Sequence, residues 1–227
     1  MGKTKIDWGF DNLHTMNAIH GCSNLCPYCY ARRMAYRLRG RCGYPQENPF
    51  KPTFTPGQLK KLDRKKPTRF FISSMGDMFD PQVKQEWRWR IYSSMAIHGQ
   101  HEYFILTKRP DMIKGPDYEA INKLNDKGIK VWLGVSISRN GAFWKAEKLS
   151  RESWPKIPLF ISFEPLLERL YPRCIENEAR KFQYFIIGGK SGPKPFYPKK
   201  EWIQNIQIQA EELKIPVYLK NNLEAKK

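Results

Sequence analysis

Three cysteines lie close together near the start of the chain, at Cys22, Cys26 and Cys29, with the spacing C-x3-C-x2-C. Thiolates packed this closely on one loop can bind three corners of a cubane iron–sulfur cluster. No fourth cysteine stands in this local run, so one iron of such a cluster would stay open to another ligand. Unliganded clustered thiols would instead be prone to oxidation. The spacing therefore favours an iron–sulfur site with one open position.

A structural zinc site is the competing interpretation of the same cysteines. Zinc requires four ligands, and Cys42, His14 or His20 could supply the fourth. Structural zinc sites usually take their cysteines from two separated pairs rather than from one triplet. The triplet spacing thus favours the iron–sulfur interpretation and leaves zinc as the alternative.

Short apolar runs follow the cysteines along the chain at fairly regular intervals. These runs predict the strands of the sheet that positions the cysteine loop. Each run is almost continuously apolar, as expected for parallel strands covered on both faces. Helix-like stretches separate them, which is typical of βα units in an α/β fold. With one strand before Cys22 the chain has about seven strands, which predicts a partial or nearly complete barrel, with a flat doubly wound sheet as the alternative. The predicted strands are 70–73, 103–106, 131–135, 159–162, 184–187 and 217–219, and the helices include 31–38, 83–97, 118–127 and 199–213.

Polar residues or glycines come directly after each predicted strand. Ligands of parallel α/β folds bind at the C-terminal ends of the strands, so these loops predict one composite site. Lys108 and Arg109 could contact a phosphate or carboxylate, and Glu164 could bind a ligand or move protons. Lys220 could close the site from the last strand.

The chain is strongly basic, with a formal net charge of +18 and a sequence pI of about 9.7. Such a pI is typical of proteins that bind a polyanion. Residues 40–67 form a proline-rich, irregular and basic insertion in an otherwise single domain spanning residues 1–227. We expect its basic residues to contact nucleic acid near the cysteine loop; they include Lys60, Lys61, Arg64, Lys65 and Lys66.

No apolar run approaches the roughly 20 residues that a membrane-spanning helix needs. Residues 1–11 lack the apolar segment of a signal peptide. We therefore expect a cytoplasmic protein that does not interact with membranes.

The cysteine pattern, with Tyr28 as an aromatic residue before Cys29, resembles the C-x3-C-x-aromatic-C signature of radical S-adenosylmethionine (SAM) enzymes. Further segments are similar to a short radical SAM family common in phages and prophages, and they cover nearly the whole chain. These segments are 74–79, 106–110, 132–136, 162–167 and 188–193. The resemblance implies a partial (β/α)6-type radical SAM barrel, to which the early strand would add a seventh, in a protein encoded by a phage or prophage.

The resemblance implies that Cys22, Cys26 and Cys29 hold a 4Fe-4S cluster whose open iron chelates SAM. Gly76 and Asp77 stand where the family pattern has a Gly-Gly-Glu motif that receives the methionine amino group, although Met75 replaces its first glycine. The other implied SAM contacts are the ribose and carboxylate contacts of Ser136 and Ser138 and the adenine contacts of Gly188 and Gly189.

The implied reaction is reductive cleavage of SAM to a 5′-deoxyadenosyl radical, which abstracts hydrogen from a substrate. The basic charge favours a nucleic acid base as that substrate, and the resemblance to phage proteins implies phage DNA pyrimidines first and tRNA second. Electrons would come from a donor such as flavodoxin or ferredoxin. The alternatives are a radical SAM enzyme acting on a free metabolite or peptide, and a non-catalytic zinc module that binds nucleic acid.

Overall fold

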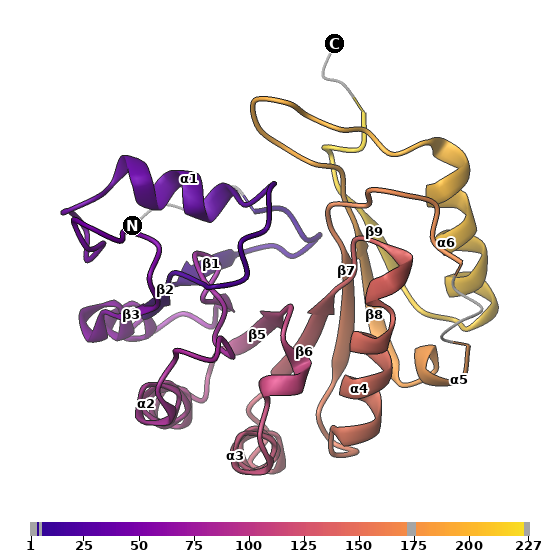
Figure 1. The fold of residues 1–227 in the computed structure, drawn as a ribbon. Helices are drawn as coiled ribbons and strands as arrows, with labels where there is room; N and C mark the ends of the chain where they lie inside the picture. The colour runs from indigo at the N-terminus through magenta and orange to yellow at the C-terminus, as the bar shows by residue number, and fades with distance from the viewer. Residues whose placement is uncertain (1–3, 5, 172–175, 225–227) are drawn as a thin grey trace.

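The computed structural model describes residue 4 and residues 6–171 and 176–224, which form one main sheet flanked by helices (Figure 1). The sheet has seven strands in the order β1-β4-β5-β6-β7-β8-β9, and every neighbouring pair is parallel. The sheet curves into a half-barrel. The half-barrel is open because its two outer strands, β1 and β9, do not pair within the described chain. The predicted α/β fold and partial barrel are confirmed. The strands are β1 (Leu13–Met16), β4 (Arg69–Ile72), β5 (Glu102–Thr107), β6 (Val131–Ser136), β7 (Leu159–Phe163), β8 (Phe182–Ile187) and β9 (Val217–Leu219).

Helices cover the outer face of the half-barrel (Figure 1). Side chains alternate between the two faces of a strand, so Phe70 and Ile72 join the core beneath the helices whereas Phe71 points to the inner face. Each strand is therefore apolar on both faces, as its sequence predicts. The connecting helices are α2 (Gln85–Ile97), α3 (Gly115–Asp126), α4 (Trp144–Glu152), α5 (Glu176–Ala179) and α6 (Lys200–Glu212). None of the described helices is long and apolar enough to cross a membrane.

A smaller unit lies beside the first strand. It consists of α1 (Tyr30–Arg37) and the antiparallel pair β2 (Ile19–His20) and β3 (Thr53–Phe54). The predicted irregular insertion, 40–67, thus contains β3 and a 3-10 helix, η1 (Pro56–Leu62).

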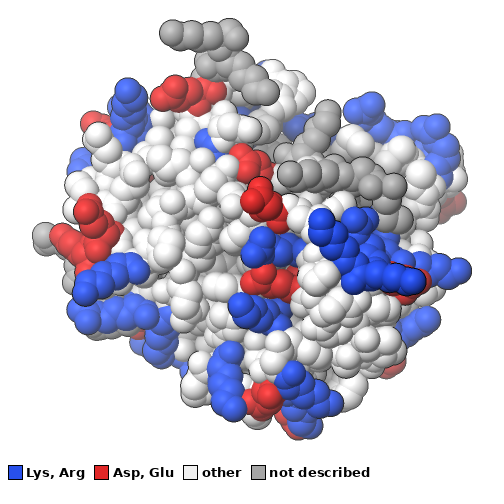
Figure 2. All heavy atoms as spheres, turned by 180° about the vertical axis from the view of Figure 1, so that it is seen from behind, with Lys and Arg blue, Asp and Glu red and all other residues white. Residues whose placement is uncertain are grey.

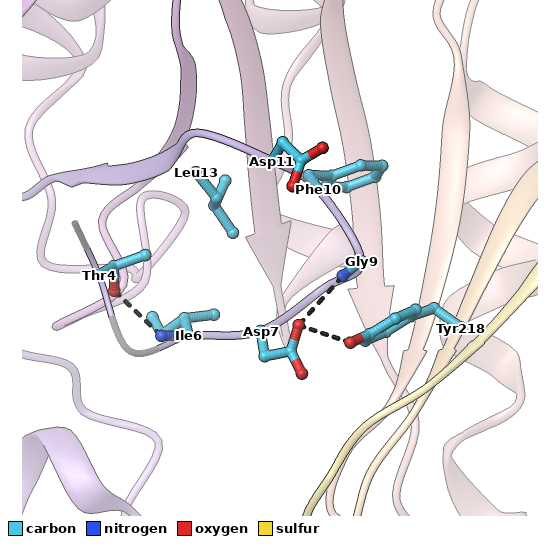
Figure 3. Close-up of a pocket in the computed structure, with 8 residues that line it drawn as sticks. All are labelled: Thr4, Ile6, Asp7, Gly9, Phe10, Asp11, Leu13 and Tyr218. Carbon is cyan, nitrogen blue, oxygen red and sulfur yellow. Dashed lines mark hydrogen bonds between the residues drawn. The ribbon is translucent and has the colours of Figure 1, made fainter.

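The N-terminal segment crosses the inner face of the half-barrel. Trp8 is 1% exposed and packs with its ring centroid 4.3 Å from that of Phe71 and 5.6 Å from that of Phe160. Asp7 accepts a hydrogen bond of 2.6 Å from the Tyr218 hydroxyl on β9 (Figure 3). This segment therefore joins the two open edges of the sheet and fills the interior with aromatic side chains. A pocket of about 350 Å³ remains beside it, lined in part by Thr4, Ile6 and Phe10.

One buried ion pair ties α2 to α3 on the outer face. The Arg88 side chain is 9% exposed and that of Asp117 is 1% exposed, with 2.8 Å between Arg88 Nε and Asp117 Oδ1. Asp117 also accepts hydrogen bonds from the Tyr92 hydroxyl and the Lys114 N–H. We expect Asp117→Ala to lower the free energy of unfolding by about 3–5 kcal/mol, because it leaves the Arg88 charge buried without a partner.

Urea unfolding of the two variants Asp117→Ala and Glu119→Ala tests this expectation. Glu119 pairs with Lys123 on the exposed face of the same helix, so its removal should cost about 0–1 kcal/mol. Equal losses in the two variants would contradict the role of the buried pair.

Candidate functional site

The cysteine loop, residues 21–29, is fastened by backbone hydrogen bonds to the C-terminal end of the main sheet. The Gly21 N–H donates to the carbonyl oxygen of Met75, just after β4, at 3.0 Å. On its other side the Cys22 N–H donates to the carbonyl oxygen of Phe50, also at 3.0 Å. The three cysteines therefore lie where the strand-end loops converge.

Two glycines make this attachment possible. Gly21 and Gly76 form a parallel bridge, and Gly21 has a φ of +85°, which favours glycine. A Cβ atom on Gly76 would lie 2.5 Å from the Gly21 carbonyl oxygen, too close for any other residue. Gly76 thus serves the close approach of the cysteine loop to β4, and its contact with SAM stays a prediction.

Asp80 holds the same loop from the other direction. Its Oδ2 accepts hydrogen bonds from the Ser23 N–H at 2.6 Å and from the Ser23 hydroxyl at 2.7 Å, and its Oδ1 accepts one from the Gln82 N–H at 3.0 Å. Asp80 is 1% exposed. Sequence reasoning missed this residue, since its partner lies far away along the chain; the signal available was an aspartate before Pro81, a common turn former.

The thiols already receive hydrogen bonds from the backbone. The Asn24 N–H donates to Cys22 Sγ at 3.3 Å, and the Arg32 N–H donates to Cys29 Sγ at 3.4 Å, so that Cys29 caps α1. Burial raises the pKa of Cys22, and the Asp77 carboxylate raises it further. Burial likewise raises the pKa of Cys29, while the Arg32 N–H lowers it. Cationic iron would displace the thiol protons, and N–H groups directed at sulfur suit a thiolate-bound cluster.

The three residues proposed as a fourth zinc ligand, His14, His20 and Cys42, lie in different parts of the structure. His20 Nε2 lies 2.9 Å from the Gly43 carbonyl oxygen, Cys42 is exposed, and His14 sits in the N-terminal half of β1. No three His, Cys, Asp or Glu side chains in the described part of the chain converge to hold a single metal ion. A mononuclear site needs all its donors about 2.0–2.3 Å from one point, whereas a cubane cluster spreads its thiolates over separate irons.

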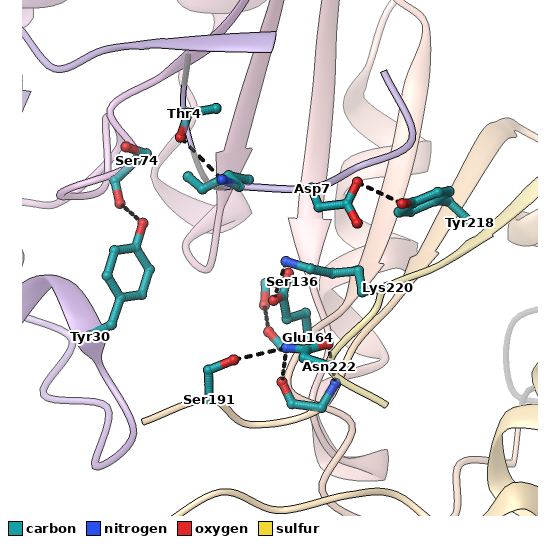
Figure 4. Close-up of polar contacts among 12 residues, drawn as sticks. Thr4, Asp7, Tyr30, Ser74, Ser136, Glu164, Ser191, Tyr218, Lys220 and Asn222 are labelled. Atoms are coloured by element: carbon teal, nitrogen blue, oxygen red, sulfur yellow. Dashed lines mark hydrogen bonds and ion pairs between the residues drawn. The ribbon is translucent and has the colours of Figure 1, made fainter. Parts of the chain in front are cut away.

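A chain of polar contacts runs along the neighbouring strand ends. Lys108 Nζ donates to Ser136 Oγ at 2.6 Å, and Ser136 Oγ donates to the Glu164 carbonyl oxygen at 3.3 Å. The Glu164 carboxylate pairs with Lys220 Nζ at 2.5 Å (Figure 4). The structure thus brings together residues that the sequence predicts at the ends of β5, β6, β7 and β9.

The cysteine loop joins this chain through Tyr28. Its hydroxyl lies 3.2 Å from Ser138 Oγ, and Lys108 Nζ lies 5.5 Å from the centre of its ring. Lys145 on α4 adds a second cation that the sequence did not indicate: burial lowers its pKa, and the Lys108 charge lowers it further. Two lysines and the cysteine loop therefore share one region.

Gly188 and Gly189 let the end of β9 approach the end of β8. A Cβ atom on Gly188 would lie 2.9 Å from Lys220 Cδ and 3.1 Å from Glu164 Cγ. The Gly189 N–H and carbonyl oxygen are both bound by the Asn222 side chain, at 3.1 and 3.0 Å (Figure 4). Their contact with adenine stays a prediction.

Asp77 and Arg109 already have partners within the protein. Asp77 accepts hydrogen bonds from the Thr107 hydroxyl at 2.7 Å and from the backbone N–H groups of Lys108 and Phe79 at 2.9 and 3.0 Å. Burial raises the pKa of Asp77, and these donors lower it. Arg109 pairs with the neighbouring Asp111 at 3.4 Å. Asp77 thus ties β4 to β5, and its predicted role toward SAM stays a prediction.

The expectation that the basic residues at the end of the insertion reach the cysteine loop is wrong, although Phe50 of the same insertion contacts that loop. Gln100 donates to the Arg64 carbonyl oxygen at 3.0 Å, and His98 pairs with Asp63 at 3.1 Å, both just before β5 begins. Lys65 and Lys66 come directly before β4. In a parallel sheet the strand starts lie at the edge opposite the strand ends, so this part of the insertion lies away from the cysteines. Cys174, which stands far from the cysteine triplet in the sequence, lies outside the described residues.

The role of Asp80 can be tested through iron retention. Asp80→Ala removes the acceptor of both Ser23 donors, and an unsatisfied buried donor costs about 1–3 kcal/mol. We expect the variant to fold but to retain less than half of the iron of the unchanged protein after anaerobic reconstitution and desalting. Asp63→Ala, which removes an exposed carboxylate at the opposite end of the sheet, is the matched control. Equal iron content in the two variants would contradict a positioning role for Asp80.

Solved chains of spore photoproduct lyase share this fold. A cysteine-to-alanine variant matches with a TM-score of 0.54 at 16% identity, a cysteine-to-serine variant with 0.54 at 17%, and the lyase complexed with dinucleoside spore photoproduct with 0.52 at 14%. Each match covers 91% of this chain and 76% of the lyase chain. Comparison with curated protein sequences finds no match. A family model described as "Protein of unknown function (DUF5131)" matches residues 3–226, and the chain therefore belongs to that family.

Proposed function

We propose that this protein is a radical SAM enzyme that modifies or rearranges a nucleic acid base. The observation that carries the proposal is the cysteine triplet with radical SAM spacing, fastened at the C-terminal end of an open parallel half-barrel. When bound, a 4Fe-4S cluster would supply the electron that cleaves SAM to the 5′-deoxyadenosyl radical, which removes hydrogen from the substrate.

The chain's own residues would bind and orient the reactants. Cys22, Cys26 and Cys29 would hold the cluster, with the N–H groups of α1 and of the loop directed at their sulfurs. SAM would lie along the strand ends, against the backbone of Gly76 and the hydroxyl of Ser138. Further SAM contacts are assigned to Tyr28, Asp77, Ser136, Gly188 and Gly189.

Glu164, Lys108 and Arg109 are proposed to act on the substrate. Lys108 presents a cation beside Tyr28 and could hold a phosphate or carboxylate, and Arg109 could assist it. Glu164 Oε1 is paired with Lys220 Nζ, so the carboxylate is held at a fixed position in the site. A carboxylate held in this way can receive or return a proton at the reacting base.

Two observations favour a nucleic acid base as the substrate. The net charge of +18 suits a polyanion. The fold is shared with spore photoproduct lyase, one structure of which is complexed with a dinucleoside spore photoproduct. DNA is the first candidate and tRNA the second, and electrons would come from a flavodoxin or ferredoxin. A duplex substrate would have to extrude the target base to bring it to the strand ends.

Iron content tests the cluster. Protein reconstituted anaerobically should bind about four irons and four sulfides, and alanine at Cys22, Cys26 or Cys29 should remove them, because each thiolate holds a separate corner. Cys42→Ala, which removes an exposed thiol outside the loop, should leave the iron content unchanged. Stoichiometric zinc without iron–sulfur absorbance would overturn the assignment in favour of the zinc module.

The modified product tests the reaction. Nucleosides from host cells that express the unchanged protein, the Cys26→Ala variant or the Glu164→Gln variant are compared by chromatography and mass spectrometry. We expect a new nucleoside with the unchanged protein, none with Cys26→Ala, and about 10²–10⁴-fold less with Glu164→Gln if Glu164 moves a proton. Glu119→Gln, an exposed change of the same kind, is the control. Unaltered nucleosides, together with SAM cleavage that a metabolite extract accelerates, would favour the metabolite alternative.

A further inference from the structure

The outer face of α1 and the turn after it is rich in arginine and contains no acidic residue. Arg32, Arg33, Arg37, Arg39 and Arg41 all fall here, and no Asp or Glu occurs anywhere in residues 12–46. All of them except Arg32 are exposed. Seen from behind, Lys and Arg side chains crowd the side of the molecule formed by the N-terminal half of the chain (Figure 2).

None of these five arginines forms an ion pair with a carboxylate in the described part of the chain. Arg41 donates to the Arg37 carbonyl oxygen at 3.0 Å, and Arg39 donates to the Tyr36 carbonyl oxygen at 3.3 Å with its guanidinium 5.8 Å from the centre of the Tyr36 ring. Like charges this close repel one another and oppose folding. An external anion would remove that cost.

Two other exposed helices, α3 and α4, are built differently. On α3, Lys123 pairs with Glu119, and on α4, Lys148 pairs with Glu152 and Arg151 with Glu147, each one helical turn away. On those helices, exposed residues of opposite charge form ion pairs, and such a surface is sufficient for solubility. The unbalanced face of α1 therefore calls for a specific explanation.

The inner face of α1 is packed against the elements that carry the cysteines. Ala31 and Ala35 are buried against Tyr44 and Phe50, and Cys22, Cys29 and Met75 pack on the same cluster of side chains. Cys29 is also the N-cap of the helix. The helix that carries the arginines is consequently packed directly against the elements that carry the three thiols.

The arginine-rich helix also contacts the turn that follows β8. Arg33 packs on Gly192, where a Cβ atom would lie 2.4 Å from the guanidinium nitrogen. Gly192 belongs to the turn after β8. In this turn the backbones of Lys190 and Phe196 form an antiparallel bridge, and Lys194 is exposed. Both α1 and this turn lie in the upper part of the molecule in Figure 1.

We propose that the outer face of α1, together with the turn at residues 190–194, binds the phosphodiester backbone of a nucleic acid. The inference rests on the proposed function and names how its substrate is held. The planar guanidinium binds phosphate through two parallel hydrogen bonds. Eight helical residues span about 12 Å, the rise of three to four nucleotides in one DNA strand. Tyr36, which is 46% exposed beside Arg39, offers a ring on which a base can stack.

Salt-dependent binding of a fluorescent single-stranded DNA oligonucleotide and of an RNA oligonucleotide of the same length tests the proposal. The double variant Arg33→Ala/Arg37→Ala should bind about tenfold more weakly near physiological salt, and the slope of log K against log salt should become shallower by about 1.4, or 0.7 for each lost phosphate contact. The double variant Lys65→Ala/Lys66→Ala removes the same charge at the opposite end of the sheet and should change neither quantity. A charge-preserving variant, Arg33→Lys/Arg37→Lys, should keep the slope and lose only part of the affinity. This result would show that changes at these two positions do not unfold the protein.

The outcomes separate this inference from the proposed function. Equal losses in the alanine and control variants, or no loss in either, would overturn the role of α1 while leaving the enzyme reaction standing. If the unchanged protein binds neither oligonucleotide, the proposal that its substrate is a nucleic acid is also wrong. Release of deoxyadenosine with dithionite tests SAM cleavage separately. If the alanine variant binds nucleic acid normally but accepts electrons poorly from flavodoxin, the arginine face serves the acidic electron donor and the proposal is wrong.

Discussion

The backbone bridge between Gly21 and Gly76 joins the cysteine loop to the end of β4, and the position of every other site residue relative to the thiols depends on it. A Cβ atom on Gly76 would collide with the Gly21 carbonyl oxygen, and the positive φ of Gly21 favours glycine there. Asp80 secures the same loop through Ser23, and Tyr28 then reaches Ser138 at the end of β6. One local contact thus places a loop from the start of the chain among strand ends contributed by its middle.

Polar contacts link the strand ends to one another, whereas the body of the sheet is apolar on both faces. Lys108, Ser136, Glu164 and Lys220 form a connected row in which each side chain has a partner. Ser136 is buried and the other three side chains are partly buried, so these hydrogen bonds and the ion pair satisfy polar groups that are largely withdrawn from water. Asp77, by contrast, has both oxygens engaged by protein donors and contributes to the link between β4 and β5.

Two groups of basic residues lie at opposite ends of the sheet. The part of the insertion that contains Lys65 and Lys66 lies where the strands begin, whereas the arginines of α1 lie beside the cysteine loop. The two groups are near each other in sequence, and net charge alone cannot distinguish them. What separates them is the path of the chain through β3 and η1, which carries residues 53–62 from the strand ends to the strand starts.

Most of the fold could be predicted from the sequence because strand and helix patterns are local. The continuous apolar runs, such as 131–135, predict buried parallel strands, and the cysteine spacing predicts a loop that can hold a cluster. The residues after each strand follow from the same pattern, since parallel strands end at one edge. The tertiary structure alone decided which distant groups meet: Asp80 with Ser23, Glu164 with Lys220, and the Arg64 segment with the start of β5. These pairings depend on how far each loop runs before it turns, which short-range residue patterns do not encode.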